Sequence, residues 1–366
     1  MLTTVLMCQQ GTPFAYSPAR DQMVDELRLR GSEVILFFPG VVNDASLKTR
    51  LKKIYDTRGM SPSSVRKKIK EINPDIVFAF TEGDTRICFP LPYIMKNTDF
   101  YYFNLEIYVY PMPYVRSERG SIVRKVVNRI DYLKNKLKEM IYVKGCRALV
   151  IQDKLRKRIL RKYGISHRVT WLIPNTYCMD YRRTDVQHKN GLIYSGGVWI
   201  NTMKSFVERV EDIGDIEITI SGRTHIKGKF KNNPNIHVIT QQLSQEEYTR
   251  FISAYDIALI WYTKHDDNLY YIGLSSGKLF KHLSLGQPVI VNNMPGLAEE
   301  VRKYRLGVVI EDVNELKDAV QTITSNYDSY VKNIKRIYEK KYDYKKNTKK
   351  FFDTVISDAN AKQKAW

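Results

Sequence analysis

Cysteine is scarce in this sequence and follows no recognisable pattern. Four cysteines occur among 366 residues, at Cys8, Cys88, Cys146 and Cys178. Their wide separation excludes the short ligand spacing of a zinc site and the dense framework of a disulfide-stabilised domain. Each lies in or beside an apolar segment, which is typical of buried free thiols.

Long apolar runs are also missing. No stretch approaches the roughly 18–20 residues that a membrane-spanning helix needs. Residues 1–10 form a strand-like segment without the basic leader of a signal peptide. The composition is nevertheless 43% hydrophobic, and the chain is long enough for two α/β domains. We expect a cytoplasmic protein, either soluble or peripheral on the inner face of the membrane.

Acidic residues are few relative to basic ones. The 59 lysines and arginines exceed the 39 acidic residues and give a net charge of +20. Such an excess attracts nucleic acid, a membrane surface or phosphorylated small molecules. The charge is concentrated at residues 119–144 and 154–168, where basic and apolar side chains alternate. This pattern is typical of a solvated helical face or of docking on anionic phospholipid, and the sequence leaves both open.

Strand-like and helical segments alternate along the chain, twice over. This order predicts parallel strands joined by crossover helices. We therefore expect an α/β fold with two doubly wound, Rossmann-like domains. The expected strands of the first span 3–8, 32–38, 75–80, 99–105, 147–152 and 169–173. Those of the second span 192–195, 216–221, 236–240, 256–261, 288–291 and 307–310.

The join between the domains is expected in the polar stretch 174–190. The predicted boundaries are residues 1–174 for the first domain and 175–328 for the second. Residues 329–366 are lysine-rich and helical in pattern, and we expect this tail to pack back on the first domain.

The segment 274–291 carries the most informative pattern. Ser275, Ser276 and Gly277 open a predicted helix, and Gly286 ends it before an apolar strand. A helix N-terminus with unpaired N–H groups and little side-chain bulk is an anion site. Lys278, in the first turn, opposes the helix dipole unless an anion lies beside it. The alternative is an ordinary helix start with a surface lysine.

In the second half the sequence resembles the GT-B glycosyltransferases, particularly those of the family-4 type. The resemblance covers about residues 146–325 and depends on an ordered series of motifs. They are the proline–asparagine linker at 171–175, the strand-and-glycine openings at 192–198 and 216–222, the strand, helix and aspartate-then-strand series at 235–259, the glycine-x-proline at 286–290 and the segment 296–301.

The resemblance implies two domains facing each other across a cleft, with a nucleoside diphosphate sugar, UDP- or GDP-linked, bound against the second. Glycines would let the backbone approach the phosphates, and lysines would neutralise charge that builds on the leaving diphosphate. No permanently bound cofactor and no metal are expected, since no paired carboxylates are arranged for magnesium. The implied donor-binding residues are Gly11, Gly196, Gly197, Lys204, Arg223, Thr240, Gln241, Ser275, Ser276, Gly277 and Lys278.

The sequence departs from the family pattern at two places. Family-4 enzymes usually carry two glutamates before the glycine-x-proline, where this chain has Gly273 and Lys281. The arginine often found after the first glycine turn is also absent, since Val198 and Trp199 follow. The family's ribose and donor-sugar contacts therefore do not carry over.

The first domain is expected to hold the acceptor. Glu82 and Asp84 follow a predicted strand, at the sheet edge where α/β proteins bind ligands. Either could act as general base, which only an inverting enzyme needs; a solvated Glu82 and a helix cap by Asp84 are the alternative. Glu106 is a further candidate. Tyrosines 101, 102, 108, 110 and 114 are predicted to stack on sugars, to meet lipid or to pack in the cleft wall.

These observations predict a hexosyl- or glycosyltransferase. It would move a sugar to a hydroxyl of a saccharide or lipid-linked saccharide, in polysaccharide or glycoconjugate assembly, with Glu82, Asp84 and Lys278 as catalytic candidates. We expect no nucleic acid as a partner, and an anionic membrane surface stays one of the two interpretations of the basic segments. The alternatives are a nucleotide-sugar epimerase or hydrolase on the same fold, and a non-catalytic basic binding protein.

Overall fold

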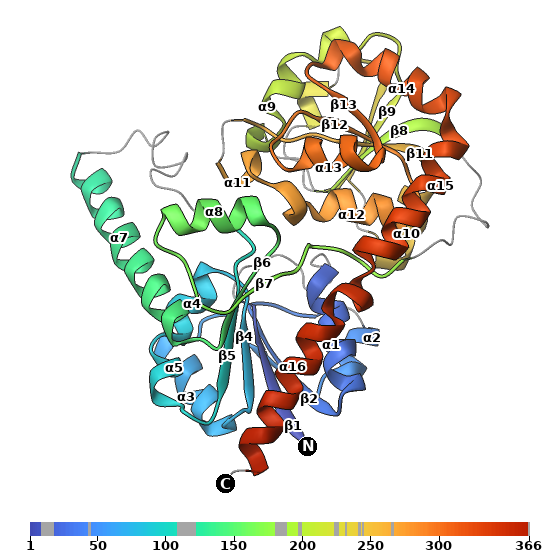
Figure 1. The fold of residues 1–366 in the computed structure, drawn as a ribbon. Helices are drawn as coiled ribbons and strands as arrows, with labels where there is room; N and C mark the ends of the chain where they lie inside the picture. Colours follow the sequence, from blue (N-terminus) through green and yellow to red (C-terminus); the bar gives the residue numbers. More distant parts are fainter. Residues whose placement is uncertain are drawn as a thin grey trace. The chain divides into compact units, whose positions relative to one another are not determined.

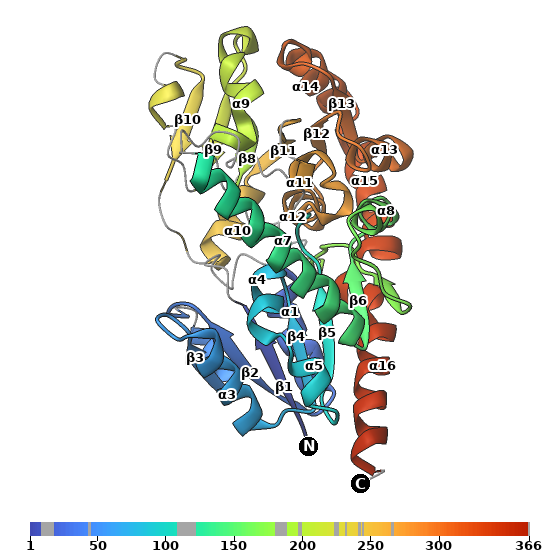
Figure 2. The same ribbon diagram turned by 90° about the vertical axis from the view of Figure 1, so that its left-hand side faces the viewer.

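The chain forms two compact units. The structure, a computed structural model, describes residues 1–8, 18–42, 45–107, 122–179, 189–196, 200–222, 227–230, 233–240, 243, 245–264 and 267–364. The first unit comprises Met1–Pro174 and Lys345–Trp366, and the second comprises Asn175–Tyr344. Figures 1 and 2 show the helices and strands of both units.

The first unit contains a seven-stranded parallel sheet in the order β3-β2-β1-β4-β5-β6-β7. The order reverses direction at β1 and β4, which is the arrangement of a doubly wound fold. The strands are β1 (Leu2–Met7), β2 (Ser32–Phe38), β3 (Lys53–Asp56), β4 (Ile76–Ala79), β5 (Asp99–Phe103), β6 (Ala148–Ile151) and β7 (Thr170–Leu172).

Helices cover both faces of this sheet because successive strand side chains point in opposite directions. On β5, Phe103 packs against Phe351 of α16, whereas Tyr102 packs against Tyr142 of α7. Figure 1 shows α16 and α7 on opposite sides of this sheet. The helices are α1 (Pro18–Leu29), α2 (Ala45–Arg50), α3 (Pro62–Ile72), α4 (Glu82–Cys88), α5 (Leu91–Ile94), α7 (Ile122–Gly145), α8 (Lys154–Lys162) and α16 (Tyr344–Lys364).

The second unit contains a six-stranded parallel sheet in the order β10-β9-β8-β11-β12-β13. Strand β11 is buried on both faces, since Ile257 and Leu259 belong to one core cluster and Ala258 and Ile260 to another. The strands are β8 (Lys189–Ser195), β9 (Ile218–Ser221), β10 (Ile236–Ile239), β11 (Tyr255–Ile260), β12 (Val289–Asn292) and β13 (Gly307–Ile310).

The helices of the second unit follow the same alternation. The α-helices are α9 (Ile200–Glu208), α10 (Gln245–Ser253), α11 (Asp267–Tyr270), α12 (Gly277–Ser284), α13 (Leu297–Tyr304), α14 (Leu316–Ser325) and α15 (Tyr327–Ile337). Single turns lie at η3 (Val210–Ile213), η4 (Lys227–Phe230), η5 (Gly273–Ser275), η6 (Val313–Glu315) and η7 (Tyr338–Tyr342). The two parallel sheets with their helices confirm the predicted α/β fold class.

The boundary between the second unit and the C-terminal tail lies at residues 344–345, later than the expected 328–329. Residues 329–344 lie in the second unit, because Ile334, Ile337 and Tyr338 pack in its core. Only the segment from Lys345 onward belongs to the first unit. Among the described residues, no helix combines the length and apolar character required to cross a membrane.

Candidate active site

Two glycine turns meet where β8 and β9 end. The Gly196 amide donates to the Ser221 carbonyl at 2.9 Å, and both Gly196 (φ +101°) and Gly222 (φ +144°) have positive φ. A Cβ atom on Gly222 would lie 2.0 Å from the Gly196 carbonyl oxygen. A Cβ on Gly196 would lie 3.0 Å from Cε of Lys278. These turns therefore need glycine, and they lie next to the start of α12.

The amino group of Lys278 lies between two tyrosine rings. Its Nζ is 4.1 Å from the ring centroid of Tyr194 and 5.4 Å from that of Tyr262, and it donates to the Tyr194 hydroxyl. The side chain is half-buried, and burial lowers the pKa of Lys278 to about 7. No carboxylate forms an ion pair with this lysine within the described ranges.

Tyr262 is held by hydrogen bonds of its backbone and of its side-chain hydroxyl. Its backbone N–H donates to Oδ1 of Asn292 at 3.1 Å, and Asn292 Nδ2 donates to the Tyr262 carbonyl at 2.7 Å. The Tyr262 hydroxyl is 2.8 Å from Oγ of Ser276. The ring that flanks Lys278 is therefore fixed to β12 and to α12.

The serines that open α12 are buried. Ser276 is the N-cap, and its Oγ accepts from the Leu279 amide at 3.1 Å. Its hydroxyl thus stabilises the helix, a role different from the expected hydrogen bond to a diphosphate. The carbonyl of Ser275 accepts from Asn175 Nδ2 at 3.2 Å, and Gly277 is the first helical residue, half-buried beside Lys278.

A series of buried, hydrogen-bonded side chains supports the end of β8. Gln287 Nε2 donates to the carbonyls of Ile252 and Tyr255, so its Oε1 accepts from Nδ1 of His282 at 2.6 Å. Nε2 of His282 lies 2.6 Å from Ser195 Oγ, and these two atoms share a hydrogen bond. This series fixes the residue before Gly196. No sequence motif indicated it.

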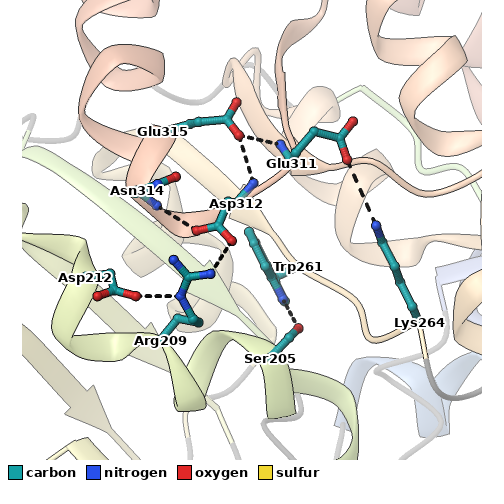
Figure 3. Close-up of polar contacts among 9 residues, drawn as sticks. All are labelled: Ser205, Arg209, Asp212, Trp261, Lys264, Glu311, Asp312, Asn314 and Glu315. Atoms are coloured by element: carbon teal, nitrogen blue, oxygen red, sulfur yellow. Dashed lines mark hydrogen bonds and ion pairs between the residues drawn. The ribbon is translucent and has the colours of Figure 1, made fainter.

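Lys204 lies on helix α9 of the second unit. Trp261, at the end of β11, is buried, and its Nε1 donates to Ser205 Oγ at 3.1 Å (Figure 3). Met203 is also buried, so Lys204 lies on α9 between two anchored residues, although its side chain is outside the described part. Thr240 follows β10 and is exposed. Gly11, Gly197, Arg223 and Gln241 lie outside the described residues.

The acidic residues after β13 are engaged in local structure (Figure 3). Glu315 Oε1 accepts from the amides of Glu311 and Asp312, while Asp312 Oδ2 accepts from Arg209 Nη1 at 2.6 Å. Arg209 also pairs with Asp212. Within the described residues, no group of three or more His, Cys, Asp or Glu side chains is placed to hold a metal ion.

Gly273 and Lys281 stand at the two positions where family-4 enzymes usually have glutamates. Lys281 Nζ donates to Thr249 Oγ1 at 2.8 Å and lies 5.2 Å from the ring centroid of Tyr177. Gly273 has φ +44° and begins the turn that leads into α12. Neither position supplies a carboxylate.

In the first unit, the candidate bases have different surroundings. Asp84 is fully buried inside α4, and its Oδ2 accepts from the Phe80 amide at 2.8 Å, whereas the N-cap of that helix is Thr81. Glu82 begins α4, and its side chain lies outside the described part. Glu106, after β5, is half-buried.

The predicted tyrosine cluster is divided between the faces of the first sheet. Tyr101 faces Phe351 of α16, and the Tyr102 hydroxyl donates to Glu139 of α7 at 2.6 Å. Tyrosines 108, 110 and 114 lie outside the described residues. The two described tyrosines therefore pack in the core.

Polar side chains gather at the carboxyl ends of β4, β5 and β6. Thr81 and Asn104 each follow their strand by one or two residues and are level in the register, since Ala79 pairs with Tyr102. Gln152 follows β6. Thr81 Oγ1, Asn104 Oδ1 and Gln152 Oε1 are buried without a hydrogen-bond partner in the described part of the chain. Unpaired buried polar atoms at a sheet edge mark a place for water or ligand hydroxyls.

Comparison with known proteins supports a glycosyltransferase. Residues 192–353 match the family model described as glucosyltransferase 3-like, C-terminal domain. A search of the curated proteins finds no match.

Three solved structures share the fold. WaaG, a glycosyltransferase involved in lipopolysaccharide biosynthesis, has a TM-score of 0.68 at 16% identity, covering 96% of this chain and 99% of WaaG. Sucrose-phosphate synthase from Thermosynechococcus elongatus has a TM-score of 0.67 at 12% identity, covering 99% of this chain and 100% of the synthase. Anabaena HepE in complex with UDP-glucose has a TM-score of 0.65 at 10% identity, and both chains are covered to 100%.

Proposed function

We propose that this chain, which has the GT-B fold and matches a glucosyltransferase C-terminal domain, is a glycosyltransferase whose donor is a nucleoside diphosphate sugar, UDP- or GDP-linked. One observation carries this proposal. Lys278 has no carboxylate partner in the described residues, yet it stands in the first turn of α12 beside the glycine turns at Gly196 and Gly222. A cation in the first turn of a helix, beside glycine turns, is complementary to a diphosphate.

The proposed chemistry is stabilisation of the leaving group. Negative charge builds on the diphosphate as its bond to the sugar breaks, and a fixed cation with N–H donors lowers that barrier. We propose that Lys278 and Lys204 supply this charge without a metal. Gly11, Gly197, Arg223, Thr240 and Gln241 remain proposed donor contacts.

We propose that the acceptor is a hydroxyl of a saccharide or lipid-linked saccharide, in polysaccharide or glycoconjugate assembly. The buried polar atoms of Thr81, Asn104 and Gln152 support an acceptor site at that sheet edge. Because Asp84 is buried in a structural hydrogen bond, Glu82 is the better proposed base. The glycosyltransferase domain does not favour an epimerase, a hydrolase or a non-catalytic basic binding protein.

We also propose peripheral attachment to the inner face of a membrane through α7. Ile130, Leu133 and Leu137 are exposed at 58%, 56% and 56%, and exposed Lys134 lies on the same helical face. Aliphatic side chains next to a lysine match the interface of an anionic bilayer.

The donor site is tested by a thermal-shift panel of nucleoside diphosphates and their sugars, including UDP-glucose and GDP-mannose. A ligand at about 100 times Kd adds about 2.7 kcal/mol of stability. We expect Lys278→Ala to weaken binding about tenfold or more, since a charged hydrogen bond is worth about 1.5–3 kcal/mol.

Lys317→Ala is the matched control, because Lys317 is exposed, lies in the same unit and pairs with Asp215. It should bind like the parent chain. A panel without any response at millimolar ligand, or equal affinity of Lys278→Ala and the parent, contradicts the site.

A further inference from the structure

We infer that Asn104 and Thr81 form a hydroxyl-binding subsite for a neutral saccharide acceptor, and that Tyr102 is the positioning residue that fixes Asn104 for this purpose. The inference rests on the proposed acceptor site at the carboxyl edge of the first sheet. It adds which side chains meet the acceptor and which chemical class of acceptor they select.

Asn104 and Thr81 lie next to each other at the ends of neighbouring strands. Ala79 of β4 pairs with Tyr102 of β5, so the residues two positions further on, Thr81 and Asn104, are level. Thr81 is still extended (φ −157°, ψ 171°), and the Asn104 amide donates to the Val150 carbonyl at 3.0 Å. Level residues of parallel strands point to the same face, and neighbouring strands are about 4.8 Å apart. One ligand hydroxyl can therefore reach both side chains, which are 3% and 1% exposed.

The side-chain amide of Asn104 is held in one orientation. Lys136 and Glu139 of α7 form a buried ion pair at 2.9 Å, and the Glu139 carboxylate accepts from the Tyr102 hydroxyl at 2.6 Å. Because that hydroxyl gives its only proton to Glu139, its oxygen accepts from Nδ2 of Asn104, at 3.2 Å. Oδ1 of Asn104 therefore faces away from Tyr102, and it is buried without a hydrogen-bond partner in the described part of the chain.

The hydroxyl of Thr81 is likewise not used by the local structure. Thr81 is the N-cap of α4, a position at which a threonine hydroxyl usually accepts from the first helical turn. This hydroxyl makes no such bond, and Oγ1 is buried without a partner among the described residues. Both oxygens have already lost water on folding, so a ligand hydroxyl gains hydrogen bonds to them without a further desolvation cost on the protein side.

The two groups are complementary to a neutral hydroxyl. Asn104 Oδ1 only accepts, whereas the Thr81 hydroxyl can donate, so together they match a group that both donates and accepts. A phosphate or carboxylate only accepts, and it would meet Asn104 Oδ1 with a like charge. Arg156 of α8 is a cation in the same region and donates to the Leu105 carbonyl at 3.0 Å, so anionic sugars are the alternative that the experiment has to test.

Saccharide binding to the full chain is measured by saturation-transfer NMR. The neutral probes are the methyl glycosides of glucose, galactose and N-acetylglucosamine, and the anionic probes are glucose 6-phosphate and glucuronate. We expect at least one neutral glycoside to bind more tightly than both anionic sugars. Among its mono-deoxyfluoro analogues, at least one should bind about tenfold more weakly, because fluorine cannot donate and leaves a buried acceptor unpaired.

Tyr102→Phe tests the positioning role. Without the tyrosine hydroxyl, the Asn104 amide can turn and present Nδ2 to the ligand, which then no longer needs to donate. The tenfold discrimination against the fluorinated sugar should therefore largely disappear. A merely structural role of Tyr102 would weaken both sugars equally and leave the discrimination unchanged.

Thr81→Val tests the second group without removing a described hydrogen bond. It should weaken the neutral glycoside about fivefold and leave the thermal unfolding midpoint equal or higher, since an unpaired buried hydroxyl is lost. Thr98→Val is the matched control in the same unit. Thr98 is also buried, but its Oγ1 donates to the Pro74 carbonyl at 2.6 Å, so this variant should lower the midpoint and leave sugar binding unchanged.

The outcomes separate this inference from the proposed function. The inference is overturned if no neutral glycoside binds, if an anionic sugar binds more tightly than all of them, or if Thr81→Val and Tyr102→Phe change neither affinity nor discrimination. Calorimetry with UDP-glucose on the same preparations tests the donor site. Donor binding without sugar binding removes the subsite alone, whereas sugar binding without donor binding contradicts the UDP-sugar site and leaves the subsite in place.

Discussion

Gly222 is a residue at which the backbone leaves no room for a side chain. An alanine there would put a methyl group 2.0 Å from the Gly196 carbonyl oxygen, at a φ of +144° that L-residues rarely adopt. Strain of this kind costs about 1–3 kcal/mol. We expect Gly222→Ala to lower the free energy of unfolding of the second unit by about 2 kcal/mol or more in urea denaturation.

Gly228→Ala is the matched control for that substitution. Gly228 has open space where its Cβ would lie and no positive φ. It should change stability by less than about 0.5 kcal/mol. Equal midpoints for the two variants would show that the chain relaxes around Gly222 and that the close approach is unimportant.

At the same scale, the sequence predicted only part of the candidate site. Gly196, Gly222 and Lys278 stand in local patterns, a strand followed by glycine and a helix start, and such patterns can be recognised in sequence. Tyr194 and His282 cannot be recognised in this way. Their partners, Lys278 and Ser195, are 84 and 87 residues distant in sequence, and only the folded sheet brings them together.

Among the elements, α7 presents the clearest test of membrane attachment. Replacing Ile130, Leu133 and Leu137 together by serine should lower partitioning onto phosphatidylcholine vesicles containing phosphatidylglycerol by at least about tenfold, measured by sedimentation. Each exposed aliphatic side chain gains up to about 1.5–3 kcal/mol on burial, and about 1.4 kcal/mol corresponds to a factor of ten.

Leu29→Ser is the control, since Leu29 is 74% exposed and lies on α1. Binding should also require the anionic lipid and decrease with salt, as basic residues near such a surface contribute about 1 kcal/mol each. Vesicle binding unaffected by the triple substitution would identify α7 as a solvated helix, the other interpretation that its sequence allowed.

Element types were more predictable than element ends. The start of α3 has a local signature that sequence can show: Ser61 Oγ accepts from the Ser64 amide and Pro62 follows. Strand β3, Lys53–Asp56, was missed because it lies at the sheet edge, is short and lacks a buried apolar run. The boundary at residue 329 was placed by lysine content, whereas α15 is held in the second unit by Ile334 and Ile337, an apolar stripe among those lysines.

For the whole molecule, alternation of strands and helices was sufficient to predict two parallel sheets. Alternation cannot predict which sheet the chain end covers, because that depends on contacts between distant segments. Phe351 of α16 packs against Tyr101 and Phe103 of β5 and against Trp171 of β7, with ring centroids 5.5–5.9 Å apart. The last helix thereby completes the core of the first unit.

Phe351→Ala tests this closure of the first unit by its C-terminal helix. Removing a buried phenylalanine costs about 3–5 kcal/mol, and Phe351 is 1% exposed. Hydrogen exchange should therefore accelerate in the amides of β4, β5 and β7, while β8 and β11 keep their protection, because the two sheets have separate cores. Leu29→Ala, at a 74% exposed site on the same unit, should leave both patterns unchanged. Equal acceleration in both units would show that they unfold as one cooperative body, and unchanged exchange in β5 would show that α16 contributes nothing to the core on which it packs.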